Sequence, residues 1–216
     1  MCGIAGFIDF TGDSSLETLK KMTSSLAHRG PDDDGFEIRR FSDVVVGFGF
    51  RRLAIIDLSP KGHQPMINEL TGDMLIFNGE VYNFSEIRKE LEALGHHFKS
   101  QSDTEVVLRS FQEWGTSCVS KFNGMFAIAL YNPTANKVQL FRDRAGVKPL
   151  FYYWDGELFL FGSELKAFHQ HPGFKKQIDF DSLALYFHHG YIPHPYSIFK
   201  KLKNYHRKQT GNKSQK

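Results

Sequence analysis

The first residue with evident chemistry lies at the start of the chain, where Cys2 follows Met1. If Met1 is removed, a thiol and a free α-amine share one residue. An α-amine has a pKa near 8, so it is a base for the thiol without the help of another side chain. Read alone, Cys2 is more simply a small apolar residue. The next segment, Gly3–Asp9, is typical of a strand that would hold the amine rigidly, and this favours a nucleophile.

A second candidate is the pair Asn78-Gly79, which follows the apolar segment Met74–Phe77. An Asn-Gly pair after a strand usually makes a hairpin turn. Here the next predicted element is a helix, so the hairpin has no return strand. The side-chain amide of Asn78 and the backbone N–H of Gly79 would then donate to one oxygen, as in an oxyanion hole.

Two charged positions complete the candidates. Arg52 precedes the long loop Asp57–Asp73, and an arginine at such a place is suited to clamp a carboxylate bidentately, although a solvated surface charge is the simpler interpretation. Asp103 lies in Ser102-Asp103-Thr104-Glu105, where the local sequence favours a plain helix cap over a ligand-binding role.

The predicted elements that position these residues come as strands, then helices, then strands again. Strands are predicted at Gly3–Asp9, Phe36–Phe41, Val44–Phe50, Leu53–Ile56, Met74–Phe77, Met125–Tyr131, Lys137–Phe141, Leu150–Trp154 and Leu158–Phe161. Helices are predicted over 16–26, Ser85–Leu94, 102–114 and Phe180–His188. This order indicates an α+β fold with largely antiparallel sheets rather than regular βαβ units.

Length, composition and charge exclude several classes of protein. With 216 residues, 41% of them hydrophobic, the chain buries a sizeable core without disulfide or metal staples. It has only two cysteines, Cys2 and Cys118, and its ten histidines show no zinc-site spacing, so no metal is expected. Seven basic residues gather in 200–216, but without stacking aromatics they predict a solvated terminus rather than nucleic-acid binding. No apolar run is long enough for a membrane helix and no signal sequence is present, so we expect a cytoplasmic protein.

Seven motifs then occur in one order, and together they resemble the glutaminase domain of glutamine-hydrolysing asparagine synthetases over about residues 2–203. These motifs are Met1-Cys2-Gly3-Ile4-Ala5-Gly6, His28-Arg29-Gly30-Pro31-Asp32, Arg52-Leu53-Ala54-Ile55-Ile56-Asp57, Asn78-Gly79-Glu80-Val81-Tyr82-Asn83, Ser102-Asp103-Thr104-Glu105, Arg142-Asp143-Arg144-Ala145-Gly146-Val147-Lys148-Pro149-Leu150 and Ser163-Glu164-Leu165-Lys166-Ala167. Each motif alone is a weak signal, whereas the combination is specific.

The resemblance implies a class II glutamine amidotransferase with the N-terminal-nucleophile hydrolase fold, a four-layer αββα sandwich of two antiparallel sheets. It implies that Cys2 attacks the amide of L-glutamine and that Asn78 and Gly79 stabilise the oxyanion. The implied glutamine-binding residues are Arg52, Leu53, Ala54, Ile55, Ile56, Asn78, Gly79, Glu80 and Asp103. Among them, Arg52 binds the α-carboxylate, and Glu80 and Asp103 hold the α-ammonium. The glutaminase reaction needs no cofactor.

The resemblance also implies a domain division. Residues 2–190 form the glutaminase domain, and residues 191–216 are expected to be a linker and basic tail at which the chain stops. Family members continue into a synthetase domain that uses ATP and Mg²⁺, and its Ser-Gly-Gly-x-Asp-Ser loop does not occur here. A separate synthetase subunit is therefore an expected partner and ammonia acceptor. Two alternatives stay open: a non-catalytic or regulatory remnant, and an amidotransferase for another acceptor such as a sugar acid.

Overall fold

The computed structural model of the chain describes residues 1–55 and 57–205. Its strands are β1 (Gly3–Asp9), β2 (Asp33–Phe41), β3 (Val44–Arg52), β4 (Met66–Ile67), β5 (Met74–Val81), β6 (Gly124–Asn132), β7 (Lys137–Arg142), β8 (Phe151–Trp154), β9 (Leu158–Gly162) and β10 (Leu202–Asn204). Its α-helices are α1 (Leu16–Ser24), α2 (Phe84–Ala93), α3 (Asp103–Trp114), α4 (Leu165–Phe168) and α5 (Phe180–His189), and two short 3₁₀ segments are η1 (Pro60–Gly62) and η2 (Gly115–Ser120).

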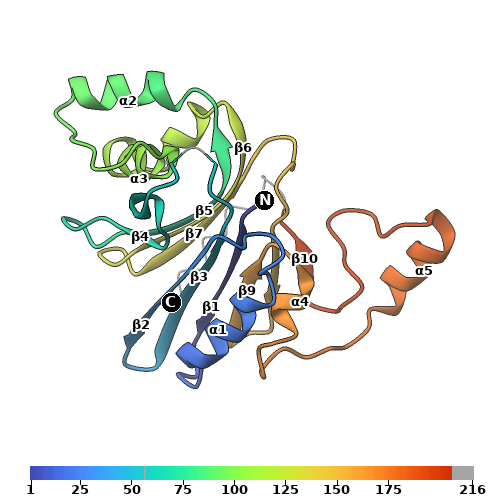
Figure 1. Cartoon of the computed structure of the whole chain (residues 1–216). Coiled ribbons are helices and arrows are strands. Elements are labelled where there is room, and N and C mark those ends of the chain that lie inside the picture. Colours follow the sequence, from blue (N-terminus) through green and yellow to red (C-terminus); the bar gives the residue numbers. More distant parts are fainter. Residues whose placement is uncertain (56, 206–216) are drawn as a thin grey trace.

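The strands form two antiparallel sheets that lie face to face, with helices on the outer face of each (Figure 1). One sheet has the strand order β10-β8-β9-β1-β3-β2 and the other β4-β5-β6-β7. Helices α2 and α3 pack on the four-stranded sheet, and α1 and α4 pack on the six-stranded sheet. The predicted four-layer αββα sandwich is therefore confirmed.

Strand β1 lies in the middle of its sheet because its residues are apolar or small on both faces. It pairs along its whole length with β3 and over Ala5–Asp9 with β9. A Cβ at Gly6 would lie 2.2 Å from the ring of Phe161, so only glycine lets the neighbouring ring cross the strand there. Hydrogen bonds on both edges of β1 hold the strand in place, and they thereby hold Cys2, the residue before it.

The core between the sheets is the layer that joins them. Phe48 and Phe161 of the six-stranded sheet meet edge to face, with ring centroids 5.3 Å apart, and both are fully buried. Met74 and Ile76 of β5 pack against the same cluster from the other sheet. Because each sheet buries its inner face in this core, the packing fixes the distance and the orientation of the two sheets.

The helix boundaries follow local chemistry closely. Ser15 caps α1 and Ser102 caps α3, each accepting a hydrogen bond from a backbone N–H in the first turn. Helix α3 ends at Trp114 and is followed by Gly115, whose φ of 56° lies in the left-handed region that favours glycine. These two helices were predicted with nearly the same bounds.

Two predicted boundaries are wrong. No strand covers Leu53–Ala54 or Ile55, and β3 ends at Arg52. Strand β5 does not stop at Phe77 but runs to Val81, because Asn78 and Gly79 pair with Ala127 and Phe126 of β6. The pairing with β6 supplies the partner strand that the local sequence lacks. The predicted loop Asp57–Asp73 also contains η1 and β4.

Residues 179–198, which lie between the paired residues Ile178 and Phe199, form an arm that leaves the body of the protein and returns to it. Helix α5 projects away from both sheets in Figure 1, and only Ser182 of the helix is buried. The chain then returns as β10, which pairs with β8, and the backbone N–H of Tyr205 donates to Leu150 O at 2.7 Å. Within the segment predicted as a linker, residues 202–204 thus belong to the six-stranded sheet.

The residues that the structure describes contain neither a helix that could cross a membrane nor a cluster of metal-binding side chains. No helix among them is long and apolar enough to cross a membrane. Within 1–55 and 57–205, no group of three or more His, Cys, Asp or Glu side chains is arranged to hold a metal ion.

The inter-sheet core makes a stability prediction. Replacing Phe48 by Ala leaves a cavity against Phe161, so the free energy of unfolding should fall by about 3–5 kcal/mol in urea denaturation. Phe187→Ala is the matched control, because that ring is 78% exposed and its loss should cost less than about 0.5 kcal/mol. Equal costs for the two variants would contradict the assignment of this core.

Candidate active site

A cavity of about 210 Å³ opens where the two sheets meet. Cys2, Phe50 and Arg52 line it from the six-stranded sheet, and β5 lines it from the other. Pockets for drug-sized ligands usually measure roughly 300–1,000 Å³, so this one suits a smaller molecule such as a free amino acid. The start of α3 closes a further side.

Cys2 directly precedes β1, and its half-buried sulfur lies against the backbone of Leu53. The N–H of Leu53 points to Cys2 Sγ at 3.4 Å, and the thiol lies 3.6 Å from Leu53 O. Burial raises the pKa of the Cys2 thiol, and the Leu53 N–H opposes this rise. The α-ammonium of Met1, Lys148 and Arg52 also act to lower the pKa of the thiol.

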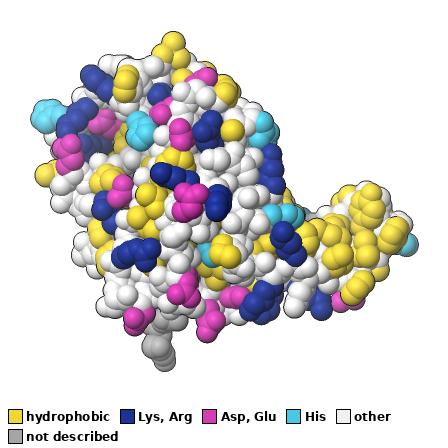
Figure 2. All heavy atoms as spheres, turned by 60° about the horizontal axis from the view of Figure 1, so that its bottom comes forward, with side chains coloured by type: hydrophobic (Ala, Val, Ile, Leu, Met, Phe, Trp, Pro, Cys, Tyr) yellow, Lys and Arg dark blue, Asp and Glu magenta, His cyan; other side chains and the backbone are white. Residues whose placement is uncertain are grey.

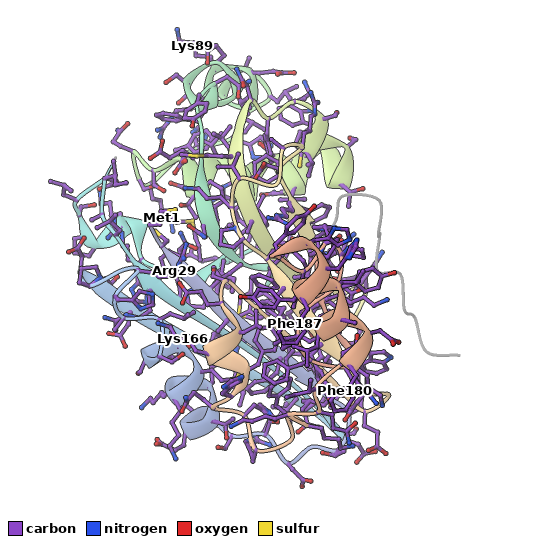
Figure 3. The ribbon with its side chains drawn as sticks, turned by 90° about the vertical axis from the view of Figure 1, so that its right-hand side faces the viewer. Met1, Arg29, Lys89, Lys166, Phe180 and Phe187 are labelled. Carbon is purple, nitrogen blue, oxygen red and sulfur yellow. The ribbon has the colours of Figure 1, made fainter. Side chains whose placement is uncertain are left out.

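The backbone of Cys2 is held by residues of two motifs that lie far apart in the sequence. Arg29 Nε donates to Cys2 O at 2.9 Å, and Arg29 Nη1 forms an ion pair with Glu164 at 2.8 Å. Although partial burial opposes it, hydrogen bonds from Arg29 and its neighbours lower the pKa of Glu164 to about 2. Next along the chain, the N–H of Ile4 donates to Ser163 Oγ at 3.1 Å. Figure 3 shows Met1 and Arg29 close together, and Arg29 Nη2 lies 3.9 Å from Met1 Sδ.

Asn78 and Gly79 reach the cavity from the middle of β5. Asn78 is 1% exposed, and its Nδ2 is buried with no hydrogen-bond partner in the described structure. A buried amide donor without an acceptor is costly, so its persistence at a cavity wall indicates a ligand acceptor. Gly79 lies so close to β6 that a Cβ would come within 2.3 Å of Met125 O, which excludes any other residue without backbone movement.

Arg52 ends β3 and is held by the loop that follows it. Its Nη1 donates to Ser59 O at 2.9 Å, and its Nη2 donates to Asp57 O. The loop passes this close because residue 62 is glycine: a Cβ there would lie 2.3 Å from Arg52 Nη2. A guanidinium has five N–H donors, so two carbonyl contacts leave others for an anion in the cavity.

Two acids line the same cavity near the junction of β5 and α3. Asp103 is the first residue of α3 rather than its cap, which is Ser102, and its Oδ2 accepts the N–H of Val81 at 3.2 Å. Burial, together with the charge of Glu80, raises the pKa of Asp103 to about 6, although backbone hydrogen bonds oppose this. Two adjacent carboxylates that are partly removed from water favour a cationic ligand group.

The cavity therefore combines a thiol, an unsatisfied amide donor, a guanidinium and a pair of carboxylates. The guanidinium matches a carboxylate and the two acids match an ammonium, which together are the ends of an α-amino acid. The thiol and the amide donor suit nucleophilic attack on a carbonyl group with stabilisation of the resulting oxyanion.

Comparisons with known proteins give the family of the chain. A family model described as a glutamine amidotransferase domain matches residues 1–214. The chain belongs to this glutamine amidotransferase family.

Named relatives of the amidotransferase domain are longer than it is. It is 43% identical to asparagine synthetase (glutamine-hydrolyzing) 3 of Bacillus subtilis, over 94% of this chain and 33% of that protein. It is 38% identical to asparagine synthetase (glutamine-hydrolyzing) 1 of the same organism, over 92% of this chain and 31% of that protein. The chain thus spans about a third of the length of these relatives.

Solved structures share the fold at low sequence identity. Glutamine phosphoribosylpyrophosphate (PRPP) amidotransferase from B. subtilis superposes with a TM-score of 0.64 at 18% identity, over 77% of this chain and 43% of that one. At such identity the likeness concerns the fold alone.

The structure brings most of the sequence-predicted site residues of the amidotransferase domain around one cavity. These are Cys2, Arg52, Leu53, Ile55, Asn78, Gly79, Glu80 and Asp103. Ala54 does not line the cavity; its N–H donates to Asp32 at 2.8 Å. Ile56 lies outside the described residues.

Sequence reasoning did not single out Gln64, whose amide supports Asn78 from the side. Gln64 Oε1 accepts the N–H of Phe77 at 2.6 Å, and its Nε2 donates to Phe77 O and to Thr104 Oγ1. The side chain thus takes the place of a strand partner beside the candidate oxyanion hole. Only its burial in a polar cluster reveals this, and no local pattern predicts it.

Lys148 was also missed as a site residue, although its motif carried the resemblance. It is 5% exposed and lines the cavity with Cys2.

The raised pKa of Asp103 predicts a stability gain on neutralisation. Unfolded Asp103 ionises near its ordinary value of 3.8 and the folded residue near 6, so its ionisation lowers stability as the pH rises through that interval. Asp103→Asn should therefore raise the free energy of unfolding at pH 8 by on the order of 2 kcal/mol, and the gain should vanish near pH 4. Urea denaturation across this range measures it.

The exposed residue Asp181 provides the control, because Asp181→Asn should change stability little at any of these pH values. A variant Asp103→Asn that is less stable than the wild type at pH 8 would contradict the electrostatic assignment.

Proposed function

We propose that the chain hydrolyses the side-chain amide of L-glutamine to L-glutamate and ammonia through a thioester on Cys2. The observation that carries this proposal is the buried, unpartnered Nδ2 of Asn78 at the same cavity as the Cys2 sulfur. Because a buried donor needs an acceptor, and a carbonyl carbon under attack places negative charge on its oxygen, the two groups are complementary parts of one reaction.

The charges of the cavity support glutamine as the substrate. Arg52 would bind the α-carboxylate, and Glu80 with Asp103 would bind the α-ammonium. The side-chain amide would then extend toward Cys2, between the Asn78 amide and the Gly79 N–H. This placement uses every charged group that the resemblance implied for glutamine binding.

In the proposed first step, the sulfur of Cys2 attacks the amide carbon and the carbonyl electron pair moves to oxygen. The α-amine of Cys2, free once Met1 is removed, takes the thiol proton and passes it to the leaving nitrogen. The C–N bond breaks, ammonia leaves, and the acyl group stays on sulfur. Water then attacks the thioester through the same oxyanion geometry and releases glutamate with regeneration of the thiol.

The product ammonia suggests amide synthesis on a further protein unit, as in the two relatives named asparagine synthetase. The reaction with ATP and Mg²⁺ would belong to that unit, since glutamine hydrolysis itself uses neither. The arm around α5 is the surface that best fits this partner. Phe180 and Phe187 are 71% and 78% exposed, and apolar side chains crowd the projecting part in Figure 2. Figure 3 labels both residues along α5.

A folded remnant without activity is the alternative that the resemblance left open. The site favours catalysis, because a remnant would have no reason to keep a buried, unsatisfied amide donor opposite a thiol.

The glutaminase proposal predicts that turnover depends on one of the two thiols. Cys2→Ala should abolish glutamate release from glutamine, because no other group forms the thioester. Cys118→Ala should retain activity, because Cys118 is fully buried among apolar residues of α3 and β6 and burial raises the pKa of its thiol to about 12. Enzyme-coupled glutamate detection on protein processed at Met1 measures both. Release that survives in Cys2→Ala would contradict the proposal.

The partner proposal predicts that the arm carries complex formation. The wild-type chain, purified from its native cells, should bring with it a protein that mass spectrometry identifies as an ATP-dependent amide-forming enzyme. Phe180→Ser combined with Phe187→Ser should lose that protein and keep glutamate release. Leu70→Ser, at an 82% exposed position outside the arm, is the control and should keep it. Retention by the double variant would contradict the role of the arm.

A further inference from the structure

The loop between β7 and β8 is closed upon itself by two side chains of the Arg142–Leu150 motif. The carboxylate of Asp143, itself buried, accepts the N–H of Val147 at 2.8 Å and that of Lys148 at 3.0 Å. Arg142 donates from Nε to Lys148 O and from Nη2 to Gly146 O, both at 2.6 Å. Hydrogen bonds to both its N–H and its carbonyl oxygen thus fix the backbone of Lys148.

Asp143 also ties this loop to the site. Its Oδ2 accepts the N–H of Phe126, the β6 residue that pairs with Gly79. The loop is therefore anchored to the strand that backs the candidate oxyanion hole, and the position of Lys148 depends on the same framework as that of Asn78.

The ammonium of Lys148 has no partner in this framework. Lys148 is 5% exposed and lines the cavity, yet none of the described carboxylates forms an ion pair with it and no described acceptor takes a hydrogen bond from it. A buried cation is unfavourable unless an anion compensates it. The cavity is therefore built to receive negative charge near Lys148.

The charges around Cys2 indicate which negative charge that is. Arg52 from β3 and Lys148 from the β7–β8 loop are the side-chain cations that act on the thiol, and Glu80 and Asp103 lie at the β5–α3 side. In the proposed binding mode, Arg52 takes the carboxylate of glutamine and the two acids take its ammonium. Arg52 then matches the carboxylate, and the two acids exceed the single ammonium by one negative charge at the β5–α3 side. Lys148 balances that charge in the sum but forms no ion pair with either described acid, and its charge acts on the Cys2 thiol. The anions that can pair with Lys148 directly are therefore those that the reaction creates at Cys2.

We propose that Lys148 is a further residue of the site, whose ammonium stabilises the thiolate of Cys2 and the oxyanion that follows from it. In this step the sulfur electron pair forms the S–C bond and the carbonyl π pair moves to oxygen, so one negative charge passes from sulfur to oxygen while Lys148 keeps its proton. The role in the oxyanion rests on the proposed glutaminase function, whereas the role in the thiolate does not. The electrostatics of the cavity agree with a role of Lys148 toward the thiolate, since the charge of Lys148 lowers the pKa of the Cys2 thiol.

The test measures the thiol directly, without turnover. Cys2 is alkylated with iodoacetamide across a range of pH in chains processed at Met1, and the modified peptide is quantified by mass spectrometry. Lys148→Met removes the charge at similar length, and alkylation at pH 7 should become about tenfold slower, with the pH profile displaced to higher pH. Lys148→Arg keeps a cation and should restore the rate to within about threefold of the wild type.

Lys89→Met is the matched control, because it removes the same charge from the exposed surface of α2, far from Met1 in Figure 3. Its alkylation profile should coincide with that of the wild type. Replacing an unpaired buried ammonium by an apolar side chain should not destabilise the fold, and urea denaturation of each variant checks this.

Turnover supplies the second readout. Lys148→Met should lower kcat for glutamine at least tenfold with KM changed less than about twofold, because the stabilised charge exists only after attack begins. An alkylation profile of Lys148→Met that coincides with that of the wild type would overturn the proposal. So would a raised KM with unchanged kcat, which would make Lys148 a binder of the substrate carboxylate. If no variant hydrolyses glutamine, the glutaminase function fails, while the alkylation profile still decides the role of Lys148 toward the thiol.

Discussion

The structure depends on one constraint, the hydrogen-bonded embedding of β1 in the middle of a sheet directly after the candidate nucleophile. A chain terminus is ordinarily the least fixed part of a domain. Here β3 and β9 bind both edges of β1, and Arg29 and Ser163 hold the residues at its start. The sulfur of Cys2 is thereby fixed against Leu53, and its distance to the facing sheet is set by the packed core between the sheets. Catalysis by a terminal residue requires this kind of preorganisation.

The four-stranded sheet contributes the candidate oxyanion donors, which the six-stranded sheet does not contain. Asn78 and Gly79 pair with β6 on one edge of β5, and the Gln64 side chain binds the backbone of the preceding Phe77 on the other edge, so the strand that carries their donors is held in place. The resulting cost, a buried amide donor without an acceptor, is tolerated because the surrounding sheet determines its place. Asp103 is a second such group. Its burial raises the pKa of its carboxyl group, so its negative charge disfavours folding. The same charge favours the binding of a cation in the cavity. Groups that lower stability are thus concentrated at the cavity, where a ligand compensates them.

Local sequence predicted the elements whose stability is local. Gly3–Asp9 was predicted with the observed bounds, because its apolar run and closing turn suffice, and α3 was found from its serine cap and terminal glycine. Leu53–Ile56 was predicted as a strand for its apolar residues, yet the chain leaves β3 there. The backbone of Leu53 instead faces the Cys2 sulfur and the N–H of Ala54 binds Asp32, and both are contacts across the fold.

The candidate site could likewise be predicted only in part. The motif residues could be assembled from a family resemblance, but their geometry could not. Asn78 and Gly79 were placed after a strand rather than within one, because pairing with a strand more than 40 residues later leaves no trace in the local pattern. Asp103 was expected to cap its helix, a role that Ser102 takes, which frees Asp103 for the cavity. The unpaired ammonium of Lys148 is visible only once the loop that carries it is folded.

The central claim is that Cys2 is a nucleophile seated beside a glutamine-binding cavity. Its most direct test is incubation of the Met1-processed chain with a diazoketone analogue of glutamine, followed by peptide mass spectrometry. We expect one adduct per chain, on Cys2 and not on the buried Cys118, and we expect excess L-glutamine to protect against it. A folded chain that forms no adduct on Cys2, or forms one that glutamine does not suppress, would contradict the account.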